Sequence, residues 1–311
     1  MLLSSRPVDT EGRRRSTNFE DRGEGGGPVG AGAAPIALLS ILARVLGIRG
    51  LLVLAGIAGL AYLFAPASVR HLLGGLLGGD STAQREGTGG STCAASPENT
   101  KACDFSRVVL ASTEDVWTAQ FGKGDLPGPT RDPGPYRPPT LVVFSDSVGT
   151  GGCGNATSAV GPFYCPSDRK LYIDPAFYQL MERRLRAPGD FAQAYVIAHE
   201  VGHHVQNLIG TNRIEKPGED RNQRSVRLEL QADCFAGVWG HTARSALAIN
   251  DKDLADALNA AHAIGDDTLG HASPAEYTHG TSAQRMRWFR SGFDSGDPQS
   301  CDTFSIGRQA L

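Results

Sequence analysis

The stretch AYVIAHEVGHHVQNLIG, residues 194–210, carries three histidines and one glutamate within an otherwise apolar helical pattern. An α-helix turns about 100° per residue, so side chains four positions apart lie on the same face. His199 and His203 are therefore predicted to point the same way from one helix. A buried polar group without a partner costs roughly 2 to 7 kcal/mol. Two imidazoles in this arrangement indicate a bound metal ion, because coordination to the metal gives each ring nitrogen a partner.

The same stretch contains an H-E-x-x-H motif, formed by His199, Glu200 and His203. In this motif two helical imidazoles bind zinc and the intervening glutamate faces the water that the metal activates. Glu200 is accordingly predicted to be the general base, which takes the proton of the water and passes it to the leaving amine. His204 lies about 100° further around the helix and is predicted to pack or hydrogen-bond outside the metal site.

A second apolar helix is predicted around RLELQADCFAGVWGH, residues 227–241. A catalytic zinc site has a third protein ligand and keeps its fourth position open for water. Glu229 is the candidate ligand, and Asp233, four residues later on the same face, is predicted to accept the second N–H of a ligand histidine, His199. The alternative is an acidic helix face exposed to solvent, which the surrounding apolar residues disfavour.

The first third of the chain differs in kind from the rest. Residues 1–35 have no periodic apolar face and are predicted to be a disordered cytoplasmic tail. Residues 45–65 supply the roughly 20 mostly apolar residues of a transmembrane helix, and residues 66–91 are typical of a Gly/Ser-rich linker. Arginines precede this span, so the positive-inside rule places the N-terminus in the cytoplasm and the domain of residues 92–311 outside. A buried core helix and a cleaved signal peptide are the alternatives.

Composition and periodicity predict one globular α+β domain, mainly helical with a small sheet. The 311 residues are 40% hydrophobic and 20% charged with a net charge of −3, which does not indicate a nucleic-acid partner. Strands are predicted at TLVVFS (140–145) and KLYID (170–174), and a helix is predicted to begin at a Ser112 cap. Further helices are predicted at about 176–187, 190–209, 222–246, 251–263 and 281–292.

Six cysteines, an even number, all follow the predicted span. Six cysteines permit 15 pairings. Local spacing favours two short-range pairs and leaves the remaining two cysteines for each other, which indicates an oxidising compartment. Reduced buried thiols remain the alternative, and a cysteine zinc site is disfavoured because no C-x-x-C pair occurs. The predicted disulfides are Cys93–Cys103, Cys153–Cys165 and Cys234–Cys301.

The segments HEVGHH, ELQADCFAGVW, GPFYCPSDRKLYID, THGTSAQRMRWFRSG and RRRSTNFEDRG together resemble the neutral zinc metallopeptidase family of bacterial membrane-anchored proteins, also called YpfJ-like. The resemblance covers most of the chain. It implies a zincin-like catalytic domain of the gluzincin type that uses Zn²⁺. It also implies a single-pass protein of the bacterial cell membrane, acting as an endopeptidase on a peptide or protein substrate in the cell envelope. Neither the resemblance nor the composition indicates an oligomeric state.

The segment THGTSAQRMRWF also resembles the C-terminal His…Arg segment of the M48 peptidases. This second resemblance implies that His279 and Arg285 are catalytic residues that stabilise the charge developing on the tetrahedral intermediate. Two structural roles are the alternative: His279 as a helix-start residue, and Arg285 as the partner of a carboxylate such as Asp233 or Glu229.

Two further expectations concern function. The strand at residues 170–174 is expected to present a free edge along which an extended substrate binds. The rival class of function is a non-catalytic membrane-anchored scaffold or binding protein with a vestigial zinc site. A closed structural zinc site usually has four Cys or His ligands, and here only three good candidate ligands are found, which favours the enzyme.

Overall fold

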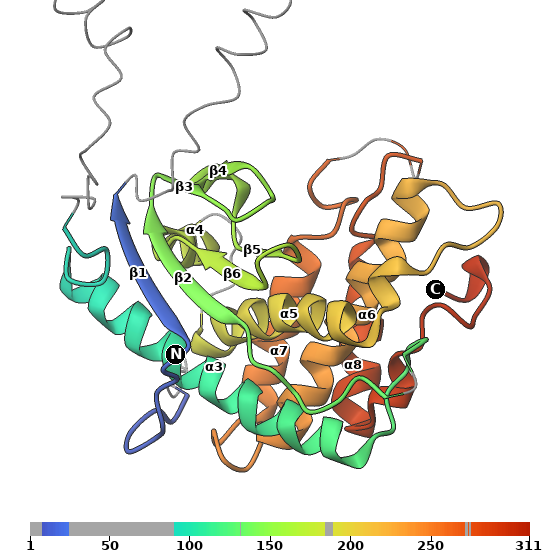
Figure 1. Ribbon diagram of the computed structural model, residues 1–311, viewed down its shortest axis with the longest axis horizontal. Coiled ribbons are helices and arrows are strands. Elements are labelled where there is room, and N and C mark those ends of the chain that lie inside the picture. Colours follow the sequence, from blue (N-terminus) through green and yellow to red (C-terminus); the bar gives the residue numbers. More distant parts are fainter. Residues whose placement is uncertain (1–7, 25–89, 131, 184–188, 271–272, 274) are drawn as a thin grey trace, which may run out of the picture. The chain divides into compact units, whose positions relative to one another are not determined.

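The computed structural model describes residues 8–24, 90–130, 132–183, 189–270, 273 and 275–311. Within these ranges the chain is an α+β protein with six α-helices and six short strands (Figure 1). The strands are β1 (Phe19–Glu24), β2 (Thr140–Ser145), β3 (Ser147–Gly149), β4 (Asn155–Thr157), β5 (Phe163–Cys165) and β6 (Lys170–Ile173). The helices are α3 (Pro97–Lys123), α4 (Ala176–Arg183), α5 (Asp190–Ile209), α6 (Arg221–Ala243), α7 (Asp251–Ala263) and α8 (Ser282–Ser295).

The main sheet has the strand order β1-β2-β6-β5. β1, β2 and β6 run parallel, and β5 pairs antiparallel with β6. β3 and β4 form a separate antiparallel pair. Because β6 lies between β2 and β5, both of its edges are occupied, and the expectation that β6 offers a free edge to substrate is wrong. β5 is the end strand on that side of the sheet.

The N-terminal segment belongs to the folded domain, so the prediction of a disordered tail is wrong for residues 8–24. β1 pairs with β2 in register from Phe19 opposite Leu141, and the side chain of Ser16 is fully buried. Arg15 forms an ion pair of 2.6 Å with Asp104 of α3. These contacts are all made by residues distant in sequence, which a search for local apolar periodicity does not detect.

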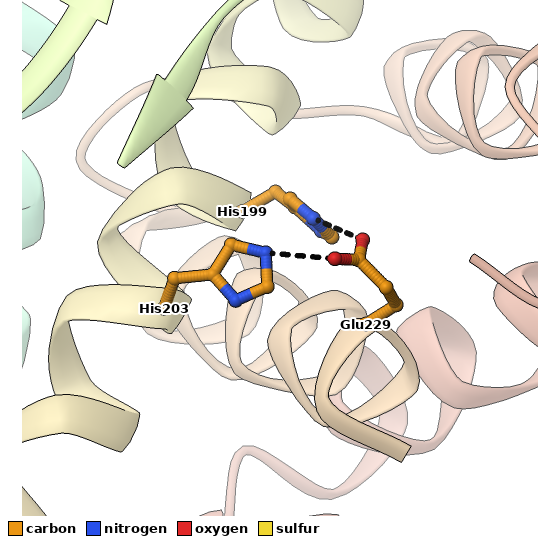
Figure 2. A group of neighbouring side chains, drawn as sticks. All are labelled: His199, His203 and Glu229. Atoms are coloured by element: carbon orange, nitrogen blue, oxygen red, sulfur yellow. Dashed lines mark hydrogen bonds and ion pairs between the residues drawn. The ribbon is translucent and has the colours of Figure 1, made fainter. Parts of the chain in front are cut away.

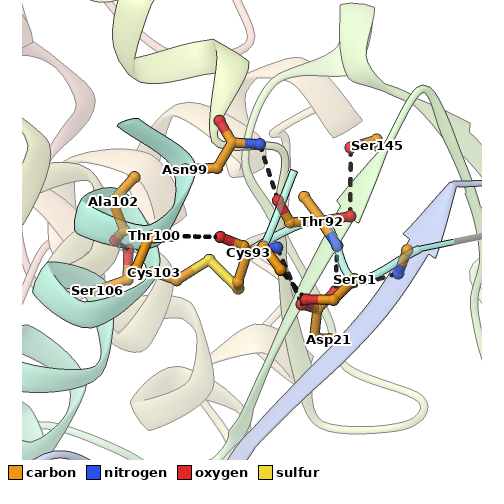
Figure 3. Close-up of a disulfide and its surroundings, with 12 residues drawn as sticks. Asp21, Ser91, Thr92, Cys93, Asn99, Thr100, Ala102, Cys103, Ser106 and Ser145 are labelled. Atoms are coloured by element: carbon orange, nitrogen blue, oxygen red, sulfur yellow. Dashed lines mark hydrogen bonds between the residues drawn. A yellow bond between two sulfur atoms is a disulfide. The ribbon is translucent and has the colours of Figure 1, made fainter. Parts of the chain in front are cut away.

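Asp21 of β1 binds three consecutive residues that precede α3, Ser91, Thr92 and Cys93 (Figure 3). Its carboxylate accepts hydrogen bonds from the backbone N–H groups of Thr92 and Cys93, at 2.9 Å and 3.0 Å, and from the hydroxyl of Ser91. The Cys93–Cys103 disulfide then joins this segment to α3. β1 and residues 91–93 are therefore held together by one carboxylate.

This arrangement corrects the predicted membrane topology and, with it, the fold class. A single transmembrane helix between β1 and α3 would put β1 and β2 on opposite sides of a bilayer, whereas the structure pairs them in one sheet. Among the helices of the described residues, none has the length and apolarity to cross a membrane. The prediction of a single membrane-spanning helix that separates residues 8–24 from the rest of the domain is therefore wrong. Residues 45–65, on which that helix was predicted, lie outside the described ranges.

Most predicted helices have the expected bounds, and α3 is the exception. α5 and α7 occupy the predicted ranges 190–209 and 251–263. α3 begins at Pro97 behind a Ser96 cap, so the helix start predicted at Ser112 is wrong. The buried residues Val108, Val109 and Leu110 continue the helical core face upstream of that position. Tertiary burial outweighs the local cap signal because a cap contributes only about 1 kcal/mol.

Glycines allow α5, α6 and α8 to approach closely. A Cβ on Gly202, inside the H-E-x-x-H helix, would lie 2.9 Å from Cα of Ala232 on α6. At the contact of α6 with α8, Gly237 and Gly292 face the backbone of the opposite helix so closely that no side chain would fit. These contacts bring residues 229 and 233 of α6 against the histidines of α5 and bring residue 285 of α8 against residue 233.

The three predicted disulfides are present in the structure. Cys93–Cys103 and Cys153–Cys165 close short loops, and Cys234–Cys301 joins α6 to the segment after α8. Cys153 is exposed, whereas its partner Cys165 is buried in β5. The second disulfide therefore fixes the loop before β5 to the end strand of the sheet.

Candidate metal centre

Two helices bring three possible metal ligands together. His199 and His203 project from α5, and Glu229 projects from α6 toward both imidazoles (Figure 2). Nε2 of His199 lies 3.1 Å from Oε2 of Glu229, and Nε2 of His203 lies 3.3 Å from Oε1. One ligand atom from each residue falls within 4.8 Å of the others. The three residues singled out from the sequence therefore converge on one point.

The donor set fits zinc. Two imidazole nitrogens and one carboxylate oxygen are a three-ligand set found in catalytic zinc sites, where the fourth position stays open. Burial alone would raise the pKa of Glu229, but His203 and His199 outweigh it and hold that pKa well below its usual value. The carboxylate is therefore ionised, as a metal ligand must be.

Asp233 orients the first histidine. Its Oδ1 lies 2.8 Å from Nδ1 of His199, so Nε2 is the ring nitrogen that faces Glu229. The carboxylate is fully buried and also accepts hydrogen bonds from Nε and Nη2 of Arg285, each at 2.9 Å, and from the hydroxyl of Tyr195. Burial lowers the pKa of His199, but Asp233 and then Glu229 raise it to about 10. Asp233 thus has the role that its i+4 spacing from Glu229 predicted.

Gln206 orients the second histidine and was not identified from the sequence. Its Oε1 lies 2.9 Å from Nδ1 of His203, and its amide nitrogen donates to the carbonyl oxygen of Leu228 on α6. The available signal was a polar residue three positions after His203 on an apolar helix, where i and i+3 side chains meet. The role of Tyr195 was also not identified from the sequence, although this residue lies four positions before His199 on the same helix face.

Glu200 borders the cleft next to the candidate ligands. Its side chain is half-buried on α5, one residue after His199, and lines the same cavity as both histidines. Burial raises the pKa of Glu200, although His203 and His199 partly offset this effect. A carboxylate whose pKa is raised above its usual value accepts a proton more readily than an ordinary carboxylate, as a general base must.

The two residues implied by the M48-like segment lie in different environments. The His279 side chain lines the cleft, is 45% exposed and has Nδ1 at 3.1 Å from Oδ1 of Asp266. Asp266, which the sequence analysis missed, also accepts the backbone N–H groups of residues 278, 279 and 280. Arg285 is only 2% exposed and is held by Asp233. The geometry therefore favours the structural alternative for Arg285 and places His279 where it can meet substrate.

His204 lies outside the group of ligands and ties the sheet to α5. Its Nε2 donates to the carbonyl oxygen of Arg137 at 2.7 Å, and its Nδ1 accepts from the hydroxyl of Tyr164 on β5 at 3.0 Å. Burial lowers the pKa of His204 to about 4, so the ring is neutral near pH 7. Asn207 donates to the same tyrosine hydroxyl. The third histidine of the opening stretch thus positions the end strand beside the metal site.

The candidate ligands lie at the floor of a cleft of about 550 Å³. Residues 160–164, which lead into and form β5, contribute to its lining. Ile264 and Leu269, between α7 and α8, line it as well. The cavity therefore combines a polar floor with apolar side chains from two separate segments, as is typical of sites that bind an organic ligand.

A helix that presents H-E-x-x-H to a glutamate from a second helix, in one cleft, has the ligand arrangement that is typical of zinc peptidases. Residues 8–304 match the family described as “Putative neutral zinc metallopeptidase”, and the chain belongs to this family.

Two relatives match this chain over different extents. Uncharacterized protein YpfJ of Escherichia coli (strain K12) is 44% identical over 305 residues, which cover 94% of this chain and 98% of the relative. Uncharacterized protein Rv2575 of Mycobacterium tuberculosis (strain ATCC 25618 / H37Rv) is 44% identical over 218 residues, covering 64% of this chain and 70% of the relative. No solved structure matches the chain.

Proposed function

We propose that this protein is a zinc-dependent endopeptidase in which His199, His203 and Glu229 hold Zn²⁺ and Glu200 is the general base. The observation that carries the proposal is the convergence of three ligand atoms within 4.8 Å at the floor of a cleft that Glu200 also lines. The membership of the zinc metallopeptidase family supports the same metal.

In the proposed reaction, each residue near the cleft floor has a separate task. Bound zinc supplies a Lewis acid that polarises the scissile carbonyl and makes water a stronger nucleophile. Glu200 takes a proton from the attacking water and delivers it to the nitrogen of the leaving amine. When its ring carries both protons, His279 donates Nδ1–H to Asp266 and Nε2–H toward the negative charge that develops on the carbonyl oxygen. Asp233 and Gln206 keep the two ligand imidazoles in their orientation.

β5 is the strand that we propose to align the substrate backbone. It ends the sheet, and Phe163 and Tyr164 line the cleft. An end strand has unpaired backbone groups that can hydrogen-bond an extended peptide. This replaces the assignment of the same task to the strand at residues 170–174, which is paired on both sides.

We propose a polypeptide of the bacterial cell envelope as the substrate and an oxidising, extracytoplasmic compartment as the place of action. Three disulfides support this location, because disulfides persist in such compartments and are rare in the cytosol. Because β1 and β2 share one sheet, the segment of residues 8–24 lies in the same compartment as the rest of the domain.

The test compares the Glu200→Gln variant with the wild-type protein, both at full length. Zinc content is measured by elemental analysis, and hydrolysis is measured with casein and with quenched fluorescent peptides. We expect Glu200→Gln to keep zinc and fold but lose hydrolysis by about 10²-fold or more. Glu182→Gln, at an exposed position on α4, is the matched control and should keep full activity. Zinc-loaded wild-type protein that cleaves none of the substrates would favour the non-catalytic scaffold instead.

A further inference from the structure

Three large apolar side chains are exposed in the described part of the chain: Val160 at 62%, Leu269 at 51% and Leu180 at 37%. Single exposed apolar residues are normal on protein surfaces. Here, however, Val160 and Leu269 both line the cleft that the candidate metal ligands also line, and Leu180 on α4 does not. The two most exposed members of the group therefore border one cavity, although 109 positions separate them in the sequence.

The segment that carries Val160 is held in place. It is a 3₁₀ turn, Ser158–Val160, in which the N–H of Ser158 donates to the carbonyl oxygen of Asp146 at 2.9 Å. Gly161 follows with a φ of +81°, and a Cβ there would lie 3.4 Å from the ring of Phe177. This backbone conformation strongly favours glycine, so the chain direction after Val160 is fixed. Val160 is therefore presented to the cleft by a defined turn.

Hydrogen bonds also hold the segment that carries Leu269 in place. The N–H groups of Thr268 and Leu269 both donate to the carbonyl oxygen of Gly265, at 3.0 Å and 2.9 Å. Asp267 in the same turn accepts the N–H of Ser282, at the start of α8, at 2.7 Å. The turn that exposes Leu269 thus rests on the helix that also supplies Arg285. An exposed apolar side chain on a fixed turn presents the same surface to each incoming ligand.

Charge is distributed unevenly within the cleft. Among the described residues that line it, the acidic, basic and imidazole groups are His199, Glu200, His203, Glu229, His279 and Arg285, and these include no lysine and no aspartate. Arg285, the one guanidinium in this lining, already pairs with Asp233. A charged substrate side chain placed against Val160 or Leu269 would lose water without gaining a charged partner from either of these two residues, which disfavours binding.

Resting on the peptidase function proposed above, we propose that the cleft selects polypeptides with a large apolar side chain next to the scissile bond. Val160 and Leu269 are the specificity-determining residues, and they remove that side chain from water. The substrate class is then an extended peptide with Leu, Ile, Phe or Val at this position. Acidic and lysine side chains are disfavoured at the same position.

The test uses the zinc-loaded full-length protein and a synthetic library of end-blocked dodecapeptides, with the cleavage sites read by mass spectrometry. We expect cleavage beside Leu, Ile, Phe or Val, and an alanine at that position should lower kcat/KM about tenfold or more. Val160→Asp and Leu269→Asp should each lower kcat/KM for the apolar peptides by a similar factor. Leu180→Asp, the third exposed apolar position, is the matched control and should leave kcat/KM unchanged.

A second measurement separates binding from catalysis. Zinc-loaded Glu200→Gln protein is titrated with the same peptides by fluorescence polarisation, and the apolar peptides should bind at least about tenfold more tightly than their Asp or Lys counterparts. Cleavage without preference for apolar residues would overturn the specificity proposal and leave the peptidase function standing. Equal effects of Val160→Asp and Leu180→Asp would also overturn it. If wild-type protein cleaves no peptide in the library, the peptidase function itself fails.

Discussion

Nδ1 of His199 and Oδ1 of Asp233 lie 2.8 Å apart between α5 and α6, and both residues are buried. This contact decides which ring nitrogen of His199 faces Glu229, and Arg285 holds the carboxylate that makes it. The orientation of one candidate ligand therefore depends on three helices, α5, α6 and α8. Such supporting contacts are measurable separately from the ligands themselves.

Asp233→Asn is expected to weaken zinc binding about 10- to 100-fold, the usual loss when a hydrogen-bond partner of a ligand histidine is changed. Asparagine keeps the shape of the side chain but loses the charge that faces His199 and Arg285. Competition with a zinc chelator measures the affinity, and circular dichroism checks the fold. Asp251→Asn, at an exposed position on α7, is the control. Unchanged zinc affinity in a folded Asp233→Asn protein would remove Asp233 from the metal site.

His279 and Arg285 are expected to give different kinetic results. His279→Ala should keep zinc and fold while lowering kcat about 10²-fold or more with little change in KM, because one donor to the developing charge is lost. Arg285→Ala should lower stability and zinc affinity, because it leaves the buried Asp233 carboxylate without its cation. Steady-state kinetics and thermal melting separate the two outcomes. Near-normal kcat in a folded, zinc-loaded His279→Ala protein would defeat its catalytic assignment.

Glu114→Ala is expected to detach the N-terminal segment from α3. The buried carboxylate of Glu114 accepts hydrogen bonds from Ser16 and Asn18 and pairs with Arg14. Removing it leaves buried donors without partners, at about 1–3 kcal/mol each. Asp115→Ala is a matched control, because Asp115 also pairs with Arg14 but is 71% exposed, and its loss should cost less than about 1 kcal/mol. Equal unfolding free energies for the two variants, measured in urea, would contradict the structural role of the segment.

Replacing Cys153 and Cys165 together by serine is expected to raise KM more than it changes zinc content. The disulfide joins an exposed loop to Cys165 of β5, and the other two residues of this strand, Phe163 and Tyr164, line the cleft. The paired replacement of Cys93 and Cys103 is the control. The Cys93–Cys103 disulfide closes a loop of similar length away from the cleft, and such a disulfide contributes about 2–3 kcal/mol to stability. Its loss should therefore lower stability without raising KM. If both double variants keep the wild-type KM, β5 does not align the substrate.

Local patterns in the sequence determined the parts of this protein that depend on neighbouring residues. The i, i+4 spacing of His199 and His203 and the apolar periodicity around them predicted the bounds of α5 and two candidate ligands. The i, i+4 spacing of Glu229 and Asp233 likewise predicted one acidic helix face, which meets His199 at Nε2 through Glu229 and at Nδ1 through Asp233. Short separations made two of the three disulfides predictable, because short loops close with a small loss of entropy.

Only the tertiary structure decided the features that depend on distant parts of the chain. The place of β1 beside β2, the edge position of β5 and the contact of Asp266 with His279 have no local signature. β1, FEDRGE, has four charged residues among its six and pairs through its backbone with a strand more than 100 positions later. Backbone pairing between strands is independent of local side-chain periodicity. The sequence alone therefore predicted a disordered tail where the folded chain has an ordered strand.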